Sequence, residues 1–170
     1  MAPVDVAGLL LDLYGRVPEL VRTAVDGLDA EQLATAPAPG ANTIGWLTWH
    51  LTRVQDDHIA DAFDMAQIWS DGDWADRFGL APDPANTGYG HSPDEMLAVR
   101  PDSSDAVVDY FTAVDERTRS VLTDLVPSDL ERIVDRRWDP PVTLGVRLIS
   151  VADDCLQHVG QAAYVRGLIT

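Results

Sequence analysis

The sequence predicts an all-α protein built as a four-helix bundle. Four stretches, each of roughly 20 residues or more, place apolar residues three and four positions apart, which is the spacing of a helix that buries one face. The segments between them are polar and contain most of the 11 prolines and 12 glycines. A chain of 170 residues falls within the usual ~100–200 residues of one domain, so residues 1–170 are expected to form a single domain.

The first helix is predicted over residues 4–25. Pro18 lies inside this stretch and should kink or interrupt the helix near Gly15, because proline lacks the backbone N–H that a helix interior requires. The buried stripe of this helix is expected to comprise Leu9, Leu13, Leu20, Val21 and Ala24.

The other three long helices have clear starting signals. The second begins at Asn42, a residue type that caps helices, and covers residues 43–63. The third covers residues 104–125, after Pro101, and the fourth covers residues 144–168 with Thr143 as its cap. The expected buried residues are Trp46, Leu47, Leu51, Val54 and Ile59 in the second; Val107, Val108, Phe111, Val114, Val121, Leu122 and Leu125 in the third; and Leu148, Val151, Ala152, Leu156, Val159 and Ala163 in the fourth.

The connecting segments also contain local signals. Residues 29–32 and 128–131 fit the spacing of a capping box. Residues 65–100, called the flap below, form a long loop between the second and third helices that is rich in aromatic residues, so we expect it to be ordered. Residues 133–142 have little helical signal and are expected to contain a short extended pair.

Charge and cysteine usage limit the partners and the compartment. The net charge is -16 and the pI is about 4.3, so the surface should repel the phosphates of nucleic acids and anionic lipids, and we expect no nucleic-acid or membrane partner. The single cysteine, Cys155, cannot form an intrachain disulfide, which fits a reducing compartment. The N-terminus lacks the basic residues of a signal peptide, and no apolar run approaches the ~18 residues of a membrane helix. We therefore expect a cytoplasmic protein.

Two of the four histidines lie on apolar helices and are candidates for a metal site. His50 is midway along the second helix, and His158 is on the fourth, four residues after Asp154, so that Asp154 and His158 project from nearly one face. Two imidazoles and a carboxylate can hold Zn(II), Ni(II) or Fe(II) and leave part of the coordination sphere open. The alternative is that the histidines are hydrogen-bonded core residues and that Asp154 and His158 form an ordinary helix-surface pair. His91, in the flap, is expected to contact solvent or a loop.

Two segments resemble the DinB-like metal-binding superfamily. One runs from Asn42 to His58 and contains Trp-Leu-Thr-Trp-His at residues 46–50; the other runs from Asp154 to Leu168 and begins Asp-Cys-Leu-Gln-His. The resemblance is close to the actinobacterial branch that contains mycothiol-dependent maleylpyruvate isomerase. It implies a bundle in up-down-down-up order, a homodimer, and a divalent metal bound by one side chain of the second helix and two of the last.

Carried onto this sequence, the implied metal ligands are His50, Asp154 and His158. The isomerase branch has a glutamate at the position of Asp154, so this chain has the shorter carboxylate. The resemblance further implies mycothiol as a co-substrate, and a thiol-dependent transferase or isomerase that acts on a small electrophile through a thiolate stabilised by the metal. A metal-dependent hydrolase and a non-catalytic protein that binds a metal or a small ligand are the alternatives.

Four residues near the predicted site are candidates for lining a pocket: Arg53, Asp57, His58 and Arg147. The two arginines could bind a substrate carboxylate, or they could be paired with the abundant Asp and Glu. Asp57 and His58 lie about two turns along the helix from His50, too far to bind the same ion, and could bind substrate or contact the flap.

Several other side chains are assigned less directly. Trp46 is expected in the core, whereas Trp49 could cover the site or a dimer face, and Arg166 is a further candidate for binding an anion. Cys155 is expected to be an inert core residue, with a soft metal ligand or a redox-sensitive thiol as the alternatives. Trp69, Trp74 and Tyr89 could roof the cavity. The sequence contains no nucleophile elbow, P-loop or dinucleotide-binding fingerprint.

Overall fold

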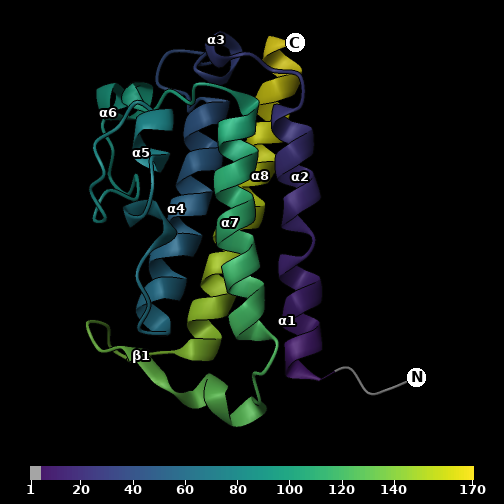
Figure 1. The fold of residues 1–170 in the computed structure, drawn as a ribbon, viewed down its shortest axis with the longest axis vertical. Helices are drawn as coiled ribbons and strands as arrows, with labels where there is room; N and C mark the ends of the chain where they lie inside the picture. Colours follow the sequence, from purple (N-terminus) through teal and green to yellow (C-terminus); the bar gives the residue numbers. More distant parts are fainter. Residues whose placement is uncertain (1–4) are drawn as a thin grey trace.

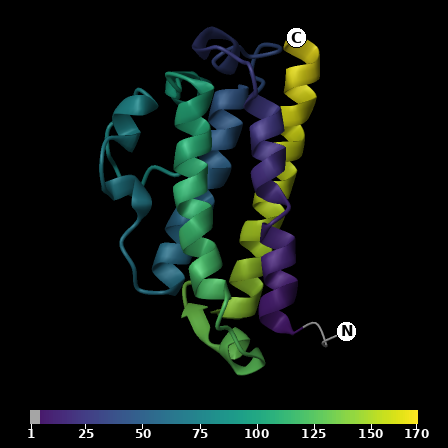
Figure 2. The same ribbon diagram turned by 45° about the vertical axis from the view of Figure 1, so that its right-hand side comes forward.

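A computed structural model describes residues 5–170 of the chain. Its long helices form a bundle in up-down-down-up order, as predicted (Figure 1). The first rising arm consists of α1 (Val6–Tyr14) and α2 (Val17–Val25), α4 (Ile44–Ala62) and α7 (Ser104–Leu122) descend, and α8 (Leu144–Ile169) rises to the C-terminus. The same arrangement is visible after a rotation of 45° (Figure 2).

The first arm is interrupted where the sequence predicts. Gly15 and Arg16 separate α1 from α2, and Pro18 lies in the first turn of α2, where its missing N–H is not needed. The predicted buried stripe is partly wrong, because Leu9 and Leu20 are 62% and 45% exposed. The core instead contains Ala7, Leu10, Tyr14, Val17, Val21 and Ala24.

Local sequence cannot choose between these two stripes, because residues 9–11 are all leucine and fit both of them. The bundle buries the stripe that contains Tyr14, whose hydroxyl donates a hydrogen bond of 2.8 Å to the carbonyl of Leu148 on α8. This contact joins residues 134 positions apart, so the local sequence of α1 gives no sign of it.

The starts of the other helices follow their capping residues. Thr143 caps α8 as predicted, and its hydroxyl accepts from the amide of Val146. The cap of α4 is Thr43, one residue after the predicted Asn42, because the Thr43 hydroxyl accepts from the amide of Trp46. α7 ends at Leu122 rather than at residue 125. On α8, Ala162 is buried and the predicted Ala163 is exposed.

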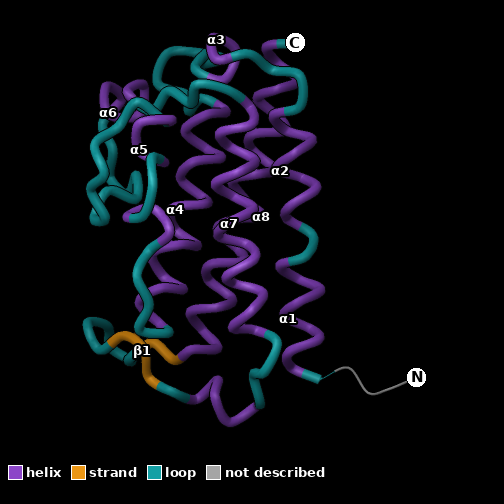
Figure 3. The backbone as a smooth tube through the Cα atoms, viewed as in Figure 1, coloured by secondary structure: helices purple, strands orange, loops and turns teal. Residues whose placement is uncertain are grey.

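The flap is ordered, as predicted, and it covers the outer side of α4 (Figure 3). It contains η1 (Ile68–Ser70), α5 (Trp74–Arg77) and α6 (Pro93–Ala98). Its buried apolar side chains are those of Trp69, Ala75, Phe78, Met96 and Val99. Because of this cover α4 is buried on nearly all sides, and polar residues such as His50, Arg53 and Asp56 lie inside the protein.

Short elements close the two ends of the bundle. At one end is α3 (Ala30–Leu33), with the predicted capping box between Asp29 and Gln32. At the other, η2 (Pro127–Glu131) precedes an antiparallel pair of β1 (Ile133–Asp135) and β2 (Val142–Thr143), the predicted extended pair. The capping box predicted at residues 128–131 is wrong, because the carboxylate of Asp129 accepts from the amide of Val126 instead.

Within residues 5–170, no helix has both the length and the apolar character needed to cross a membrane.

Candidate metal centre

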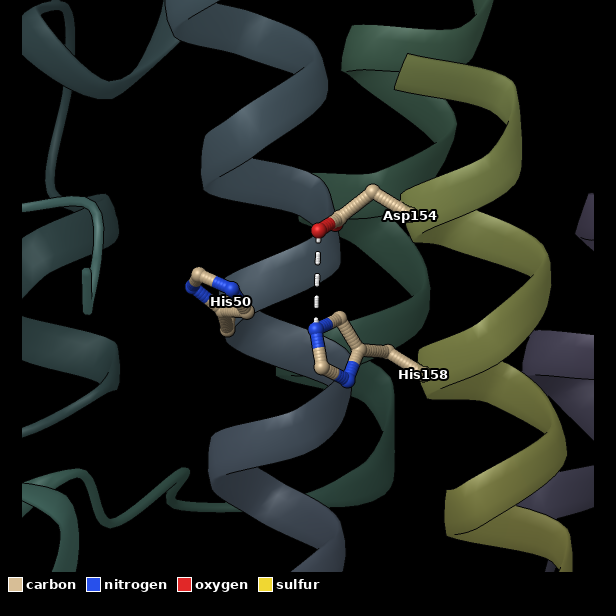
Figure 4. Close-up of side chains that lie close together, drawn as sticks. All are labelled: His50, Asp154 and His158. Carbon is tan, nitrogen blue, oxygen red and sulfur yellow. Dashed lines mark ion pairs between the residues drawn. The ribbon is translucent and has the colours of Figure 1, made fainter. Parts of the chain in front are cut away.

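The structure brings His50, Asp154 and His158 together between α4 and α8 (Figure 4). One candidate ligand atom from each of the three side chains lies within 4.8 Å of the other two. Asp154 and His158 are one turn apart on α8, and His50 projects toward them from the antiparallel α4. Sequence spacing places two of these side chains on one face, and the packing of the two helices adds the third.

His50 is held as a neutral imidazole with one free nitrogen. Its Nδ1 lies 2.5 Å from the carbonyl oxygen of Thr87, and because a carbonyl only accepts, Nδ1 carries the proton. Burial lowers the pKa of His50, which keeps the ring uncharged at neutral pH. Nε2 is therefore the nitrogen with a lone pair available. Trp46 stacks on the ring, with centroids 4.6 Å apart and planes 13° from parallel.

Asp154 and His158 form an incompletely satisfied pair. His158 Nδ1 lies 2.8 Å from the side-chain oxygen of Gln161 and so donates to it, while Nε2 faces an oxygen of Asp154 at 3.5 Å. The other oxygen of Asp154 is buried and has no hydrogen-bond partner among the described residues. Hydrogen bonding to Asp154 raises the pKa of His158, which means that a proton stabilises this arrangement in the absence of another cation.

This donor set fits a divalent cation. It offers two neutral imidazole nitrogens and one carboxylate, the mixed nitrogen and oxygen ligands that suit Zn(II), Ni(II) and Fe(II). A cation would also satisfy the orphaned oxygen of Asp154 and the unshared electron pair of His158 Nε2. Three protein ligands leave coordination positions open to a small molecule.

The flap packs directly against this centre through Gly88. Gly88 has φ +90°, and a Cβ there would lie 2.8 Å from Nδ1 of His50 and 2.9 Å from the ring of Trp49. His91 Nδ1 accepts from the indole N–H of Trp46 at 3.1 Å, which makes His91 a loop contact as expected. The sequence gives no local signal for the roles of Thr87 and Gly88, because their partners are 37 or more residues away.

A cavity of about 560 Å³ is lined by Asp154, the one member of the three side chains that borders it. Its wall also contains Val54, Asp57, His58, Thr87, Tyr89, Asp135, Arg137, Trp138 and Arg147. The sequence predicts four of these wall residues: Asp57, His58, Tyr89 and Arg147. It did not single out Asp135, Arg137 or Trp138, which the short β1–β2 hairpin brings over the cavity.

The charged groups of the cavity wall are paired with one another. Arg147 donates to Asp135 at 2.8 Å, and hydrogen bonds from Arg137 hold the pKa of Asp135 well below its usual range. Asp57 accepts from the side chain of Gln67 at 2.7 Å, which is the predicted contact with the flap. Burial, followed by the charge of Arg147, lowers the pKa of His58, so this imidazole is neutral in the wall.

The structure corrects the expectation that Arg53 lines a pocket and binds an anion. Arg53 is fully buried, absent from the cavity wall, and hydrogen-bonded to Asp56 and to the flap. Arg166 donates to the carbonyl of Ala24, away from the site.

The structure also places the remaining aromatic residues and the cysteine whose roles were expected from the sequence. Trp46 is buried in the core, as expected, and also contacts His50 and His158. Trp49 and Trp69 are buried too and pack on each other. Trp74 packs on Tyr110, so of the three aromatics expected over the cavity only Tyr89 borders it. Cys155 is buried in the core, and burial raises the pKa of its thiol, which fits the inert assignment.

Comparison with known proteins gives the family of the chain. Residues 14–170 match the family model of mycothiol S-transferases. The chain belongs to the mycothiol S-transferase family. This mycothiol S-transferase family member is also similar to the crystal structure of a conserved protein from Enterococcus faecalis, with a TM-score of 0.89 and 30% sequence identity over 98% of each chain. Among curated proteins, none matches it.

Membership in the mycothiol S-transferase family confirms the DinB-like resemblance and the predicted fold. It also supports a thiol-transferase-like function, in which a thiol and another small molecule are the substrates.

Proposed function

We propose that this protein is a divalent-metal-dependent S-transferase that joins mycothiol to a small electrophile. The observation that supports this most directly is the meeting of His50, Asp154 and His158 within 4.8 Å of one another, beside a cavity of about 560 Å³. That volume lies in the usual range of small-molecule sites, roughly 300–1,000 Å³.

The three side chains would hold the cation through defined atoms. His50 and His158 each have Nδ1 committed as a donor, to Thr87 and to Gln161, so each offers Nε2. Asp154 offers the buried oxygen that lacks a partner. A divalent cation in this position supplies the charge that lowers the pKa of a thiol and stabilises the thiolate.

The transfer itself needs a proton acceptor and a place for the two reactants. The thiol loses its proton, its sulfur forms a bond to the electrophilic carbon, and the leaving group departs with the electrons of the bond that breaks. His58 is the neutral imidazole in the cavity wall, and we assign to it the acceptance of this proton. With an activated double bond as the electrophile, reversal of the addition after rotation would give cis–trans isomerisation.

The body of the thiol and the electrophile would lie in the cavity. Asp57 and Arg147 offer a hydrogen-bond acceptor and donors in its wall, and Tyr89 and Trp138 offer exposed aromatic surfaces at its edge. Paired charges in the wall favour polar ligands with both donors and acceptors over strongly charged ones.

The proposal is tested by metal content and thiol-dependent turnover. Protein purified without an affinity tag or chelator is assayed by mass spectrometry for metal, beside His158→Ala and, as a control in the same cavity, His58→Ala. About one equivalent in the wild type and in His58→Ala, and none in His158→Ala, supports the site. Consumption of a chloromethyl fluorogenic electrophile only when mycothiol is present, lost in His158→Ala, supports the S-transferase.

Other results would replace the proposal. Metal binding without turnover favours a non-catalytic binding protein, and turnover of an ester or amide without any thiol favours a metal-dependent hydrolase. Absence of metal after reconstitution with Zn(II), Ni(II) and Fe(II) would overturn the metal site itself.

A further inference from the structure

Arg53 lies one turn along α4 from His50 and uses every hydrogen-bond donor it has. It is fully buried, and a guanidinium has five N–H groups. The five acceptors are the carbonyl of Asn86 at 3.1 Å, the carboxylate of Asp56 and the hydroxyl of Tyr110 at 3.3 Å each, and the side chain of Gln67 and the carbonyl of Pro84 at 2.8 Å each. Arg53 therefore has no N–H left to bind a ligand, and its role is to fix the groups to which it donates hydrogen bonds.

One part of this network anchors the beginning of the flap. Asp56 pairs with Arg53 and also accepts from the backbone amides of Ile68 and Trp69 at 2.8 Å each. The hydroxyl of Tyr110 donates to the same carboxylate at 2.9 Å. The buried charges of Arg53 and Asp56 are therefore compensated, and η1 is fixed against α4.

The other part anchors the flap backbone next to His50. The carbonyls of Pro84 and Asn86 bind Arg53, and these residues lie three and one positions before Thr87. The carbonyl of Thr87 accepts from Nδ1 of His50. The side chain of Asn86 continues the same structure, because it accepts from the amide of Gly88 at 3.3 Å and contacts Nε2 of His91 at 2.8 Å.

His91 completes the contact from a second side. It accepts from the indole N–H of Trp46, and the Trp46 ring stacks on His50. The segment 84–91 therefore reaches His50 both at its ring nitrogen and, through Trp46, at its face. Arg53 is the side chain of α4 that binds the backbone of this segment at two carbonyls.

We propose that Arg53 is a positioning residue for His50. By holding the carbonyls of Pro84 and Asn86, Arg53 places the Thr87 carbonyl on Nδ1 of His50, which fixes the tautomer with the proton on Nδ1 and the lone pair on Nε2. This inference rests on the proposed function in one respect, since the free Nε2 matters because it is the atom His50 would give to a cation.

A lysine could not do the same. Its single ammonium presents three donors from one point, whereas the planar fork of Arg53 spans Asp56 on one side and two flap carbonyls on the other. Arg53→Lys keeps a positive charge beside Asp56 and removes the bridge, which makes it the informative substitution.

The experiment measures the tautomer of His50 in the metal-free protein by long-range ¹H–¹⁵N NMR, together with metal affinity by competition with a chelator. In the wild type we expect the proton on Nδ1. In Arg53→Lys we expect a mixture of tautomers and a metal affinity lowered by about tenfold to a hundredfold. The matched control is Arg132→Lys, because Arg132 binds a carbonyl of α4 at Ala62, far from His50, and should change neither quantity.

A second variant keeps the test decisive if Arg53→Lys does not fold. Asn86→Ala leaves Arg53 in place but removes the side chain that supports Gly88 and His91, and it should shift the tautomer in the same direction. A wild-type His50 protonated on Nε2, or an unchanged tautomer in the folded variants, overturns the proposal. Because the tautomer is measured without metal, a failure of the metal site would show separately, as an absence of metal binding in the wild type.

Discussion

The feature of single residues that matters most here is the pairing of Asp154 with His158. Nε2 of His158 and an oxygen of Asp154 lie 3.5 Å apart. Because His158 donates to Gln161 through Nδ1, a neutral His158 presents a lone pair at Nε2, and this lone pair faces the carboxylate oxygen unless a proton or a cation lies between them. The second oxygen of Asp154 is buried without a partner. Both features would be satisfied by a bound cation, and both can be tested by changing one side chain.

Asp154→Asn should weaken metal binding at least tenfold, because it replaces a negative ligand with a neutral amide of the same shape. Asp154→Glu, the residue of the isomerase branch, should retain binding with altered affinity. Competition with a chelating dye measures both. Equal affinity of wild type and Asp154→Asn would show that the carboxylate is not a ligand.

Asp115→Asn should stabilise the protein at neutral pH by about 1 kcal/mol, because one oxygen of this buried carboxylate has no hydrogen-bond partner in the described chain. Burial raises the pKa of Asp115. A carboxyl whose pKa is higher in the folded than in the unfolded state stabilises the fold most at low pH, and this contribution is lost as the pH rises through the folded-state pKa.

Urea unfolding at pH 4 and pH 7 checks this prediction. The gain of Asp115→Asn should be larger at pH 7 than at pH 4, whereas Glu116→Gln, on the exposed neighbouring residue, should change stability little at either pH. A loss of stability at pH 7 would contradict the account of Asp115 as an unsatisfied charge.

How much of the site the sequence predicts depends on how far apart along the chain the interacting residues are. Asp154 and His158 are one turn apart, so spacing alone places them together, and His50 is the candidate on the facing helix that the resemblance also implies. The hydrogen-bond partners that orient these side chains cannot be predicted from spacing. Thr87 lies 37 residues from His50, and nothing in the flap sequence indicates which carbonyl meets the imidazole.

Among the structural elements, the flap has the most influence on the site. It turns α4 from a half-exposed bundle helix into a buried one, and it brings Gly88 against His50, Trp49 and Trp46. Gly88 is needed twice, for its φ of +90° and for the absence of a Cβ that would lie within 3 Å of two of these rings.

Gly88→Ala should therefore lift the flap from α4, break the hydrogen bond from His50 to Thr87, and weaken metal binding. Its matched control is Gly90→Ala, which has a similar φ of +76° but no atom within 4 Å of an added Cβ. The control should cost only the backbone strain, about 1–2 kcal/mol of unfolding free energy, and leave metal affinity unchanged. Chemical denaturation and chelator competition on both variants separate the two effects, and equal behaviour of the two would contradict the close contact.

The helices illustrate a second limit of prediction at this scale. Capping residues and apolar spacing place all four arms of the bundle within a few residues, because those signals are local. The buried face of α1 cannot be read from local signals, because residues 9–11 are all leucine and the buried residue Tyr14 has its hydrogen-bond partner, Leu148, on α8. The same holds for Arg53, whose spacing from His50 suggests a shared pocket while the flap encloses it.

At the scale of the whole molecule, charge and exposed apolar surface act against each other. The net charge of -16 drives copies of the chain apart and should prevent binding to nucleic acid. On α8, however, Val146, Ile149, Tyr164 and Leu168 are more than half exposed. At 100° per residue, Val146, Tyr164 and Leu168 fall within about 40° of one another around the helix axis. Ile149 lies about 60° from Val146 in the direction away from Leu168. The apolar side chains therefore lie toward the two ends of one face of α8, with Asp153 and Gln157 exposed between them.

We predict that this face of α8 forms the homodimer that the family resemblance implies. Sedimentation velocity should give twice the chain mass of 18.5 kDa, and added salt should strengthen association because it screens the repulsion between two acidic copies. Tyr164→Glu should yield a monomer that still binds metal, since Tyr164 is 71% exposed and is not a neighbour of the three ligands.

Leu97→Glu, an exposed apolar position on α6 across the bundle, should leave the dimer intact. A wild-type monomer at tens of micromolar would show the expectation to be wrong, and a dimer unaffected by Tyr164→Glu would place the interface on another face.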